Sequence, residues 1–383
     1  MKRVTEIKDR WSQDQLATGM GFLSWMRVLH RNQYQVGLDY FHRLAWVTGL
    51  SIPMSALALA EKALYGRKIG ETELKTPLFI LGHWRSGTTH LHNLLGRDPQ
   101  HCFSTVYQAV FSTHFVLSGR VGPNLLRNAL PATRSYDQVK HGWFEAAEDE
   151  IGLVKLNDGL SFYLALMFPD LAEEYERLID LREASNEERQ RWKDAFILYL
   201  KKLTFDSPGT RVVVKSCPHS ARIPLLLEMF PDAKFVHIHR HPARVFVSMV
   251  HMRGKIDWEN FLRRPTEEFI GSRREHTLRI GERVFGRLLE DRHSIPKENL
   301  IEIAYDDLCG NEMEMIKGLY QQLELGGWEG YQPILADYLD GVAGYKINRL
   351  SIDEETLDLV YERWRSVYDA FRYPREEGPP REG

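Results

Sequence analysis

From residue 78 to residue 89 the chain reads Leu-Phe-Ile-Leu-Gly-His-Trp-Arg-Ser-Gly-Thr-Thr. The first four residues form the short, uninterrupted apolar run that is typical of a strand buried on both faces of a parallel sheet. Gly82 and Gly87 permit a tight turn after that strand. Leucines at helical spacing follow, at Leu91, Leu94 and Leu95. The stretch therefore predicts a strand, a glycine-rich loop and a helix, in that order.

Three more apolar runs of the same kind predict further strands, at residues 211–214, 235–238 and 300–304. Helical patterns lie between and after them, at residues 89–95, 223–230, 243–252, within 170–203, and at 312–323. Strands that alternate with helices are typical of a parallel sheet covered by helices. We expect an α/β domain.

Residues 1–73 carry apolar side chains at helical spacing, for example Phe22, Trp25, Met26 and Leu29. We expect a helical N-terminal extension there, an α/β domain over residues 74–373, and a frayed tail over 374–383. Packing of the N-terminal helices on the core is the favoured interpretation, and peripheral contact with a membrane is the alternative. The longest charge-free run, residues 44–60, is shorter than the roughly 20 residues that a membrane span needs.

Composition narrows the classes of function. The net charge of −3 is too balanced for a surface built to bind nucleic acid. Three widely separated cysteines, Cys102, Cys217 and Cys309, suggest neither a disulfide framework nor a metal site. The charged N-terminus lacks the apolar stretch of a secretion signal. We expect a cytoplasmic protein, and the sequence leaves its oligomeric state open.

The loop at residues 82–89 has the chemistry of a phosphate site. Its spacing matches the phosphate loop of ATPases and GTPases, except that Thr88 stands where those proteins keep a lysine. Backbone N–H groups and a helix N-terminus meet an anion in such a loop, and Arg85 adds a cation from another position. A tight connection with no ligand is the alternative for this motif on its own.

A second motif follows the strand predicted at residues 235–238. Arg240 stands at the end of that strand, where parallel sheets bind ligands, and Ser248 lies two turns into the next helix. This pair could hold a second phosphate. Taken alone, an exposed arginine and a solvated serine would explain it equally well.

Together the two motifs resemble those of the sulfotransferases that use 3′-phosphoadenylyl sulfate (PAPS), in particular the bacterial branch with G-x-x-R-S-G-T-T. The resemblance runs from about residue 77 to residue 323 and implies a three-layer, P-loop-like fold. It implies that PAPS is the sulfate donor, that adenosine 3′,5′-bisphosphate (PAP) is the product, and that no metal is needed. It places the 5′-phosphosulfate on residues of the first loop and the 3′-phosphate on Arg240 and Ser248. The residues of the first loop are Arg85, Ser86, Gly87, Thr88 and Thr89.

The resemblance also implies a catalytic lysine and histidine after the strand predicted at residues 211–214, at Lys215 and His219. Arg85 and Lys215 suit the negative charge that grows on the leaving oxygen. His219 is the first candidate for the base that accepts the proton of the acceptor hydroxyl, because a histidine titrates near neutral pH. Glu148, in an acidic group with Glu145, Asp149 and Glu150, is the second candidate, and a solvated acidic face is the alternative for that group. Another three histidines, His237, His239 and His241, are expected to pack or to form hydrogen bonds.

The expected acceptor is a small-molecule hydroxyl. Aromatic residues between the first loop and the next strand favour an apolar alcohol such as a sterol or lipid, with a carbohydrate next, although a protein core uses the same residues. A P-loop kinase or nucleotide hydrolase is the nearest alternative function. A non-catalytic nucleotide sensor is a further one.

Overall fold

The computed structural model describes residues 4, 16–134, 140–342 and 350–376. The chain forms two compact units. The first comprises residues 1–75, 103–209 and 253–273, and the second comprises residues 76–102, 210–252 and 274–383. The expected N-terminal extension thus belongs to a larger unit that includes two later segments. Most of the expected tail, residues 377–383, lies outside the described residues.

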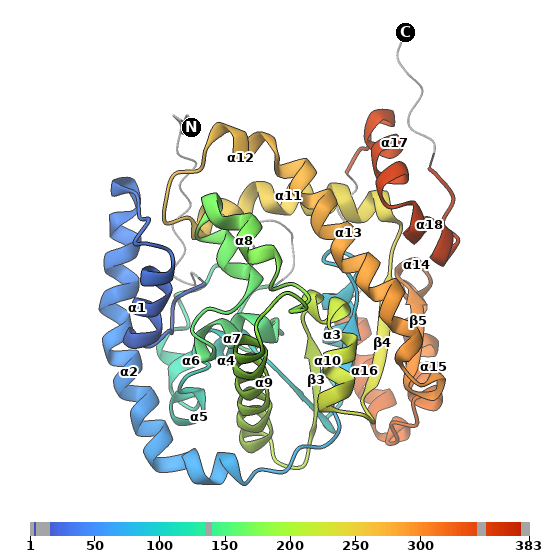
Figure 1. Ribbon diagram of the computed structural model, residues 1–383. Helices are drawn as coiled ribbons and strands as arrows, with labels where there is room; N and C mark the ends of the chain where they lie inside the picture. The colour runs from blue at the N-terminus through green and yellow to red at the C-terminus, as the bar shows by residue number, and fades with distance from the viewer. Residues whose placement is uncertain (1–3, 5–15, 135–139, 343–349, 377–383) are drawn as a thin grey trace. The chain divides into compact units, whose positions relative to one another are not determined.

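The second unit contains the parallel sheet (Figure 1). Its strand order is β2-β3-β1-β4-β5, and β1 pairs in parallel with β3 and β4, as β4 does with β5. The four strands expected from the sequence are confirmed, while the short edge strand β2 was not expected. The strands are β1 (Leu78–Leu81), β2 (His101–Phe103), β3 (Arg211–Lys215), β4 (Lys234–His239) and β5 (Leu300–Ala304).

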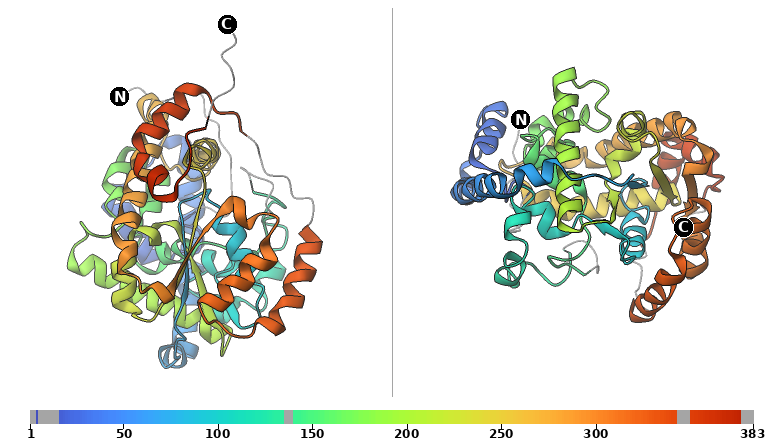
Figure 2. Two further views of the ribbon diagram at one scale, coloured as in Figure 1. Left: turned by 90° about the vertical axis from the view of Figure 1, so that its right-hand side faces the viewer. Right: turned by 90° about the horizontal axis from the view of Figure 1, so that it is seen from below.

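Alternate side chains of the strands enter two different layers of packing. Leu78, Ile80 and Val236 join a core with α3 (Thr88–Leu95), α15 (Glu312–Gln322) and α16 (Trp328–Val342). Figure 2 shows these helices on one side of the sheet and α13 (Arg273–Asp291) on the other. On the face opposite that core, Phe79 stacks on Phe235, with ring centroids 5.3 Å apart. The expected α/β fold with helices flanking a parallel sheet is confirmed.

A further core of the second unit joins its C-terminal helices to α11 and α13. Trp364 packs against Phe246 and Phe285 and donates a hydrogen bond from its indole Nε1 to the carbonyl of Leu278, at 3.0 Å. The remaining elements of this unit are η4 (Cys217–Ala221), α10 (Ile223–Met229), residues 242–252 of α11 (Pro242–Asn260), η5 (Arg292–Ser294), η6 (Lys297–Asn299), α14 (Tyr305–Leu308), α17 (Glu354–Arg363) and α18 (Arg365–Phe371).

The first unit is helical in its described residues apart from isolated bridges and the last residue of β2. Its two longest helices are α2 and α9. The elements are α1 (Phe22–Arg31), η1 (Leu38–Tyr40), α2 (Phe41–Gly70), α4 (Val106–Val110), α5 (Phe115–Ser118), α6 (Gly122–Leu125), α7 (Asp149–Leu156), η2 (Phe162–Leu166), η3 (Pro169–Leu171), α8 (Ala172–Glu176), α9 (Asn186–Asp206) and α12 (Glu267–Gly271).

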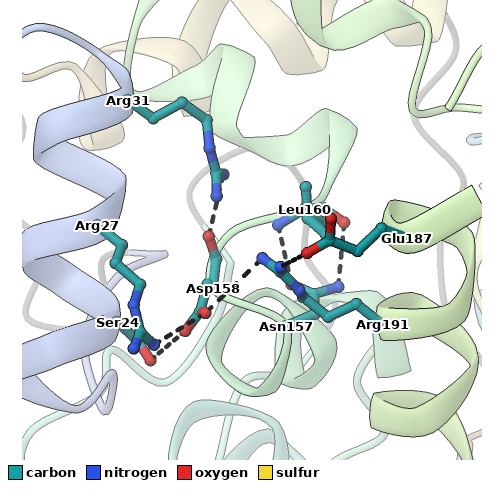
Figure 3. A network of polar contacts seen from close by, with 8 residues as sticks. All are labelled: Ser24, Arg27, Arg31, Asn157, Asp158, Leu160, Glu187 and Arg191. Carbon is teal, nitrogen blue, oxygen red and sulfur yellow. Dashed lines mark hydrogen bonds and ion pairs between the residues drawn. The ribbon is translucent and has the colours of Figure 1, made fainter. Parts of the chain in front are cut away.

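A polar network centred on Asp158 holds α1 in the first unit (Figure 3). The Asp158 carboxylate accepts hydrogen bonds from the Ser24 hydroxyl at 2.6 Å and from the Arg27 guanidinium at 3.0 Å. Its backbone carbonyl accepts one from Arg31, also at 3.0 Å. Asp158 adopts a positive φ of 57° directly after α7. Three side chains of one helix therefore converge on a single residue of the α7–η2 turn.

One helical segment of the described chain, Leu38–Gly70, is long and apolar enough to cross a membrane by length and composition. Only 17% of its most apolar window is buried. The charge-free run noted in the sequence forms the middle of this segment, and the continuous helix extends beyond the run at both ends.

A glycine in α13 tests the packing of Trp364. A Cβ atom at Gly281 would lie 2.1 Å from Cζ2 of Trp364, so Gly281→Ala forces the indole or the helix to move. We expect the free energy of unfolding, measured by denaturant titration, to fall by about 1–3 kcal/mol. Gly286 in the same helix has no neighbouring atom within 4 Å of such a Cβ. Gly286→Ala should therefore be neutral or stabilising by about 0.5–1 kcal/mol. Equal losses in the two variants would contradict the packing described.

Candidate active site

The turn between β1 and α3 adopts the tight path that its glycines predict. Gly87 has a φ of 104° and is the N-cap of α3, where it offers no side-chain cap to the helix. A Cβ atom at Gly87 would lie 2.2 Å from Cδ2 of Tyr305, and one at Gly82 would lie 2.6 Å from the carbonyl oxygen of Ile238. Both positions therefore need glycine. The first N–H groups of α3, left without a side-chain cap, face the position of an anion in a loop of this kind.

Arg85 contacts both residues of the second motif, Arg240 and Ser248. Nε of Arg85 donates a hydrogen bond to the Ser248 hydroxyl at 2.9 Å. Nη1 of Arg240 lies 3.4 Å from the carbonyl oxygen of Arg85. Two guanidinium groups thus lie beside the glycine turn at the carboxyl end of the sheet, where three strands of the second unit end. Two arginines at one glycine turn are typical of a site for a multiply charged anion.

Two further features shape this cluster of arginines. Arg85 has a positive φ of 70°, an uncommon conformation for a residue with a side chain. The guanidinium of Arg240 lies over the ring of Tyr305, 4.4 Å from its centroid. Tyr305 therefore contacts both the glycine turn and the second motif and fixes the position of Arg240 by a cation–π contact.

The segment after β3 lies against the start of the loop. Lys215 ends β3, is buried, and is in register with Ile80 of β1. The hydroxyl of Ser220 accepts a hydrogen bond from the backbone N–H of Gly82 at 2.8 Å. Thr88, which stands at the lysine position of the ATPase loop, is buried, and its hydroxyl lies 4.0 Å from the sulfur of Cys217. The lysine and the loop are thus parts of one structural unit.

His219 lies in the same segment with its side chain fully buried. Its ring meets Phe79 edge-on, with centroids 6.0 Å apart, on the aromatic face of the sheet. Packing with an aromatic core is the environment of a structural histidine, although a base can also be buried until its substrate binds. The structure thus places His219 beside the loop without a solvent-facing nitrogen.

The three histidines around the end of β4 form hydrogen bonds, in line with the expectation that they pack. Nδ1 of His237 lies 2.9 Å from the Glu302 carboxylate, and Nδ1 of His239 lies 2.8 Å from the Tyr373 hydroxyl. Nε2 of His241 donates to the carbonyl of Pro374, at 2.9 Å. The start of the expected tail therefore contacts the end of β4.

The charge of the loop comes from arginine and lysine rather than from histidine. Burial lowers the pKa of His83 to about 4, although its hydrogen bond to the carbonyl of Trp84 opposes the shift. His83 is therefore neutral at pH 7. Burial also raises the pKa of Tyr373, with Asp306 and Asp307 adding to the shift and Arg240 opposing it. The cationic side chains of the site are Arg85, Arg240 and Lys215.

Glu148 belongs to the first unit, at the N-cap of α7. Its carboxylate accepts a hydrogen bond from the Tyr163 hydroxyl and is half-buried. The neighbouring acidic residues do not form a solvated face: Asp149 and Glu150 are buried, and Glu150 accepts a hydrogen bond from Ser161 at 2.7 Å. Glu145 pairs with Lys140 at 3.2 Å.

Sequence reasoning missed two residues of the second unit that shape the site. No role is assigned from the sequence to Tyr305 or to Ser220, which stands beside His219. The available signal for Tyr305 was its place directly after a strand, at the same edge of the sheet as Arg240. Ser220 carried no signal, because its contact with Gly82 depends on how two distant segments meet. Among the described residues no group of three histidine, cysteine or carboxylate side chains is placed to hold a metal ion.

Residues 77–330 match the model of the sulfotransferase family. The chain is 33% identical, over 382 residues, to an omega-hydroxy-beta-dihydromenaquinone-9 sulfotransferase, Stf3, of Mycobacterium bovis, and equally to that of Mycobacterium tuberculosis. The match covers 99% of this chain and 97% of the relative.

Two solved structures share the fold. Sulfotransferase STF9 from Mycobacterium avium has a TM-score of 0.65 at 16% identity, covering 98% of this chain and all of that one. Sulfotransferase STF1 from Mycobacterium tuberculosis has a TM-score of 0.59 at 18% identity, covering 90% of this chain and 91% of that one. With the family model and the full-length relative, the glycine turn and its arginines identify the chain as an enzyme that belongs to the sulfotransferase family.

Proposed function

We propose that this sulfotransferase takes its sulfuryl group from PAPS and transfers it to the hydroxyl of a lipid alcohol. The observation that carries the donor assignment is the contact of Arg240 with the loop at Arg85, beside Ser248. A donor with anionic groups at two ends needs two anion sites on one edge of the sheet, and these residues supply both. We also propose that the enzyme works in a reducing cytoplasm, which its three free cysteines suit.

The side chains present fit such a donor. The uncapped N-terminus of α3 and Arg85 suit the phosphosulfate. We assign the 3′-phosphate to Arg240 and to Ser248, whose hydroxyl accepts a hydrogen bond from Arg85. Tyr305 keeps the Arg240 guanidinium in place, so less conformational entropy is lost when a phosphate binds. No metal is needed for this chemistry, because arginine and lysine neutralise the negative charge of the donor that a metal ion would otherwise neutralise.

The reaction is a transfer between two oxygens. The bond from sulfur to the donor's phosphate oxygen breaks, a bond from sulfur to the acceptor oxygen forms, and the acceptor's proton passes to a base. PAP leaves with the negative charge. Arg85 and Lys215 are the residues to stabilise that charge, and the loop holds the donor still while the acceptor approaches.

Of the two candidate bases we now prefer Glu148. The ring of His219 is fully buried against Phe79, whereas the carboxylate of Glu148 is half-buried and oriented by the Tyr163 hydroxyl. A base must reach the acceptor oxygen to within hydrogen-bond distance. We therefore propose Glu148 as the base and give His219 a packing role beside the loop.

The proposed acceptor class rests on the full-length relative and on the aromatic content of the first unit. The relative is named for a hydroxylated dihydromenaquinone, a lipid alcohol. In this chain Tyr107, Phe111 and Trp143 form a cluster with centroids 4.8–5.9 Å apart, and Phe144 beside them is 69% exposed. Such side chains suit an apolar acceptor better than a sugar.

Replacing Arg240 tests the donor site. Arg240→Ala removes the paired guanidinium, so the affinity for PAP should fall by about 2 kcal/mol or more, roughly 30-fold, in isothermal titration calorimetry. Arg244→Ala is the matched control, because that arginine lies four residues further along and pairs with Glu376 at 2.7 Å. PAP should bind without magnesium. Unchanged PAP affinity in the Arg240 variant would remove Arg240 from the donor site. Magnesium-dependent turnover of ATP by the wild type would instead support a nucleotide hydrolase.

A pair of variants tests the base. We expect Glu148→Gln to lower kcat by about 100-fold or more with unchanged PAP affinity, because it removes only the proton acceptor. Tyr163→Phe keeps the carboxylate and should have a much smaller effect. His219→Asn should lower kcat less than tenfold when kcat is calculated per folded enzyme, with the folded fraction taken from a thermal-stability measurement. The reverse pattern would assign the base to His219.

A panel of acceptors tests the substrate class. Purified enzyme given PAPS labelled on sulfur should transfer the label to long-chain prenyl alcohols and to ω-hydroxylated menaquinones, detected by thin-layer chromatography and mass spectrometry. Sterols should react more slowly, and sugars and tyrosine peptides should not react. Label appearing only on sugars would overturn the lipid assignment while leaving the donor assignment intact.

A further inference from the structure

The helix α2 exposes apolar side chains where a surface helix of a soluble protein exposes polar ones. Its buried side is mixed: it carries charged and hydroxyl groups, at Arg43, Ser51 and Glu61, beside the apolar Val47 and Ile69. Figure 1 shows this helix in blue, with α1 along one side.

The exposed side forms one continuous stripe, which we call the outer stripe of α2. Its residues recur at intervals of three and four, the spacing of one helix face. No charged side chain of residues 44–60 interrupts it, over about 25 Å of helix. Ile52 is 61% exposed and Leu59 is 69% exposed. The outer stripe consists of Phe41, Ala45, Trp46, Gly49, Ile52, Pro53, Ala56, Leu59, Ala63 and Leu64.

The opposite side is fastened to the first unit by polar contacts. The buried Arg43 donates a hydrogen bond from Nη1 to the carbonyl of Phe261, at 2.8 Å. The buried Glu61 pairs with the buried Lys202 of α9 at 2.5 Å, and its carboxylate accepts a hydrogen bond from the N–H of Leu117 at 2.9 Å. These partners would be lost if α2 left the unit, so the helix does not cross a bilayer on its own.

Cationic side chains lie at the end of the stripe. Arg67 continues the line of the outer stripe one turn beyond Ala63, and Lys62 and Lys68 flank it on either side. All three are exposed, and Arg67 contacts Glu71 at 3.5 Å. At the other end stand Leu38, which is 92% exposed, and Phe41 and Trp46, aromatic residues of the type found at membrane interfaces.

We propose that the outer stripe of α2 binds the surface of a lipid bilayer, with the helix lying in the plane of the membrane. The apolar side chains enter the boundary between headgroups and acyl chains, and Lys62, Arg67 and Lys68 meet anionic headgroups. A bilayer fits better than a second protein, because the middle of the stripe offers almost no hydrogen-bonding side chain, whereas protein interfaces carry about one hydrogen bond per 100–200 Å².

This inference rests in part on the proposed lipid acceptor. A long-chain alcohol stays in the membrane, so an enzyme that modifies its hydroxyl gains from binding at the membrane surface. The docking itself is a property of α2 and can be measured without donor or acceptor. Failure of the membrane-binding proposal can therefore be told apart from failure of the proposed lipid acceptor.

The experiment is flotation of the full-length protein with vesicles of phosphatidylcholine and 30% phosphatidylglycerol, without nucleotide. We expect the wild type to float with the vesicles. The double variant I52E/L59E should bind at least tenfold more weakly and retain its PAP affinity and thermal stability. Leu198→Glu, on an exposed apolar residue of α9, is the matched control and should float like the wild type. Lys62→Glu with Lys68→Glu should reduce binding to anionic vesicles more than binding to neutral ones.

Four results would overturn the proposal. Wild-type protein that stays with the soluble fraction, or a double variant that floats as well as wild type, would remove the outer stripe as the contact. A dimer by light scattering that the double variant dissociates, together with absent flotation, would assign the stripe to a second copy of the chain. Bound protein that resists extraction with alkaline carbonate would mean that α2 crosses the bilayer rather than lying on it.

Discussion

The site depends on the electrostatic requirement of holding two arginines and a lysine at one end of a parallel sheet. Like charges this close repel, and the arrangement becomes favourable when anions lie between them. The protein supports the cations with neutral partners: Ser248 for Arg85, the ring of Tyr305 for Arg240, and strand β3 for Lys215. The glycine turn also leaves the N-terminus of α3 open, so the positive end of the helix dipole is available without an added side chain.

The parallel register makes this convergence possible. Because β1, β3 and β4 pair in parallel, the residues that follow each strand arrive at the same edge. The loop at 82–89 lies more than a hundred residues before Lys215 and Arg240 in sequence, yet each of the three follows or ends one of these neighbouring strands. Ser220 ties two of the connections together through the backbone of Gly82. The family's donor chemistry thus uses the geometry of the sheet edge and requires little else from the rest of the second unit.

The first unit uses polar groups differently. Its buried charges, Arg43, Glu61 and Lys202, serve to attach α2, and Asp158 serves to attach α1. Burying paired charges is costly, and replacing them with apolar residues often stabilises a protein. Their presence on the inner side of α2, opposite an apolar outer stripe, is explained if the outer side has its own apolar environment.

The sequence determined the local elements and the chemistry of the donor site. The apolar runs predicted four of the five strands, because strands buried on both faces need uninterrupted apolar side chains. The glycine spacing predicted the loop, because Gly87 and Gly82 leave room for no Cβ atom. The spacing of Arg240 and Ser248 predicted a pair, and the resemblance assigned it to a phosphate.

The tertiary structure decided what depends on distant contacts. It showed that His219 packs against Phe79, that Tyr305 supports Arg240, and that Asp149 and Glu150 are buried rather than solvated. It also decided which side of α2 faces outward. Apolar residues lie on all sides of this helix between residues 44 and 60, so hydrophobicity alone does not say which side faces outward. The buried pairing of Glu61 with Lys202 helps to fix the orientation, and an ion pair formed by residues 141 positions apart exists only once the chain has folded.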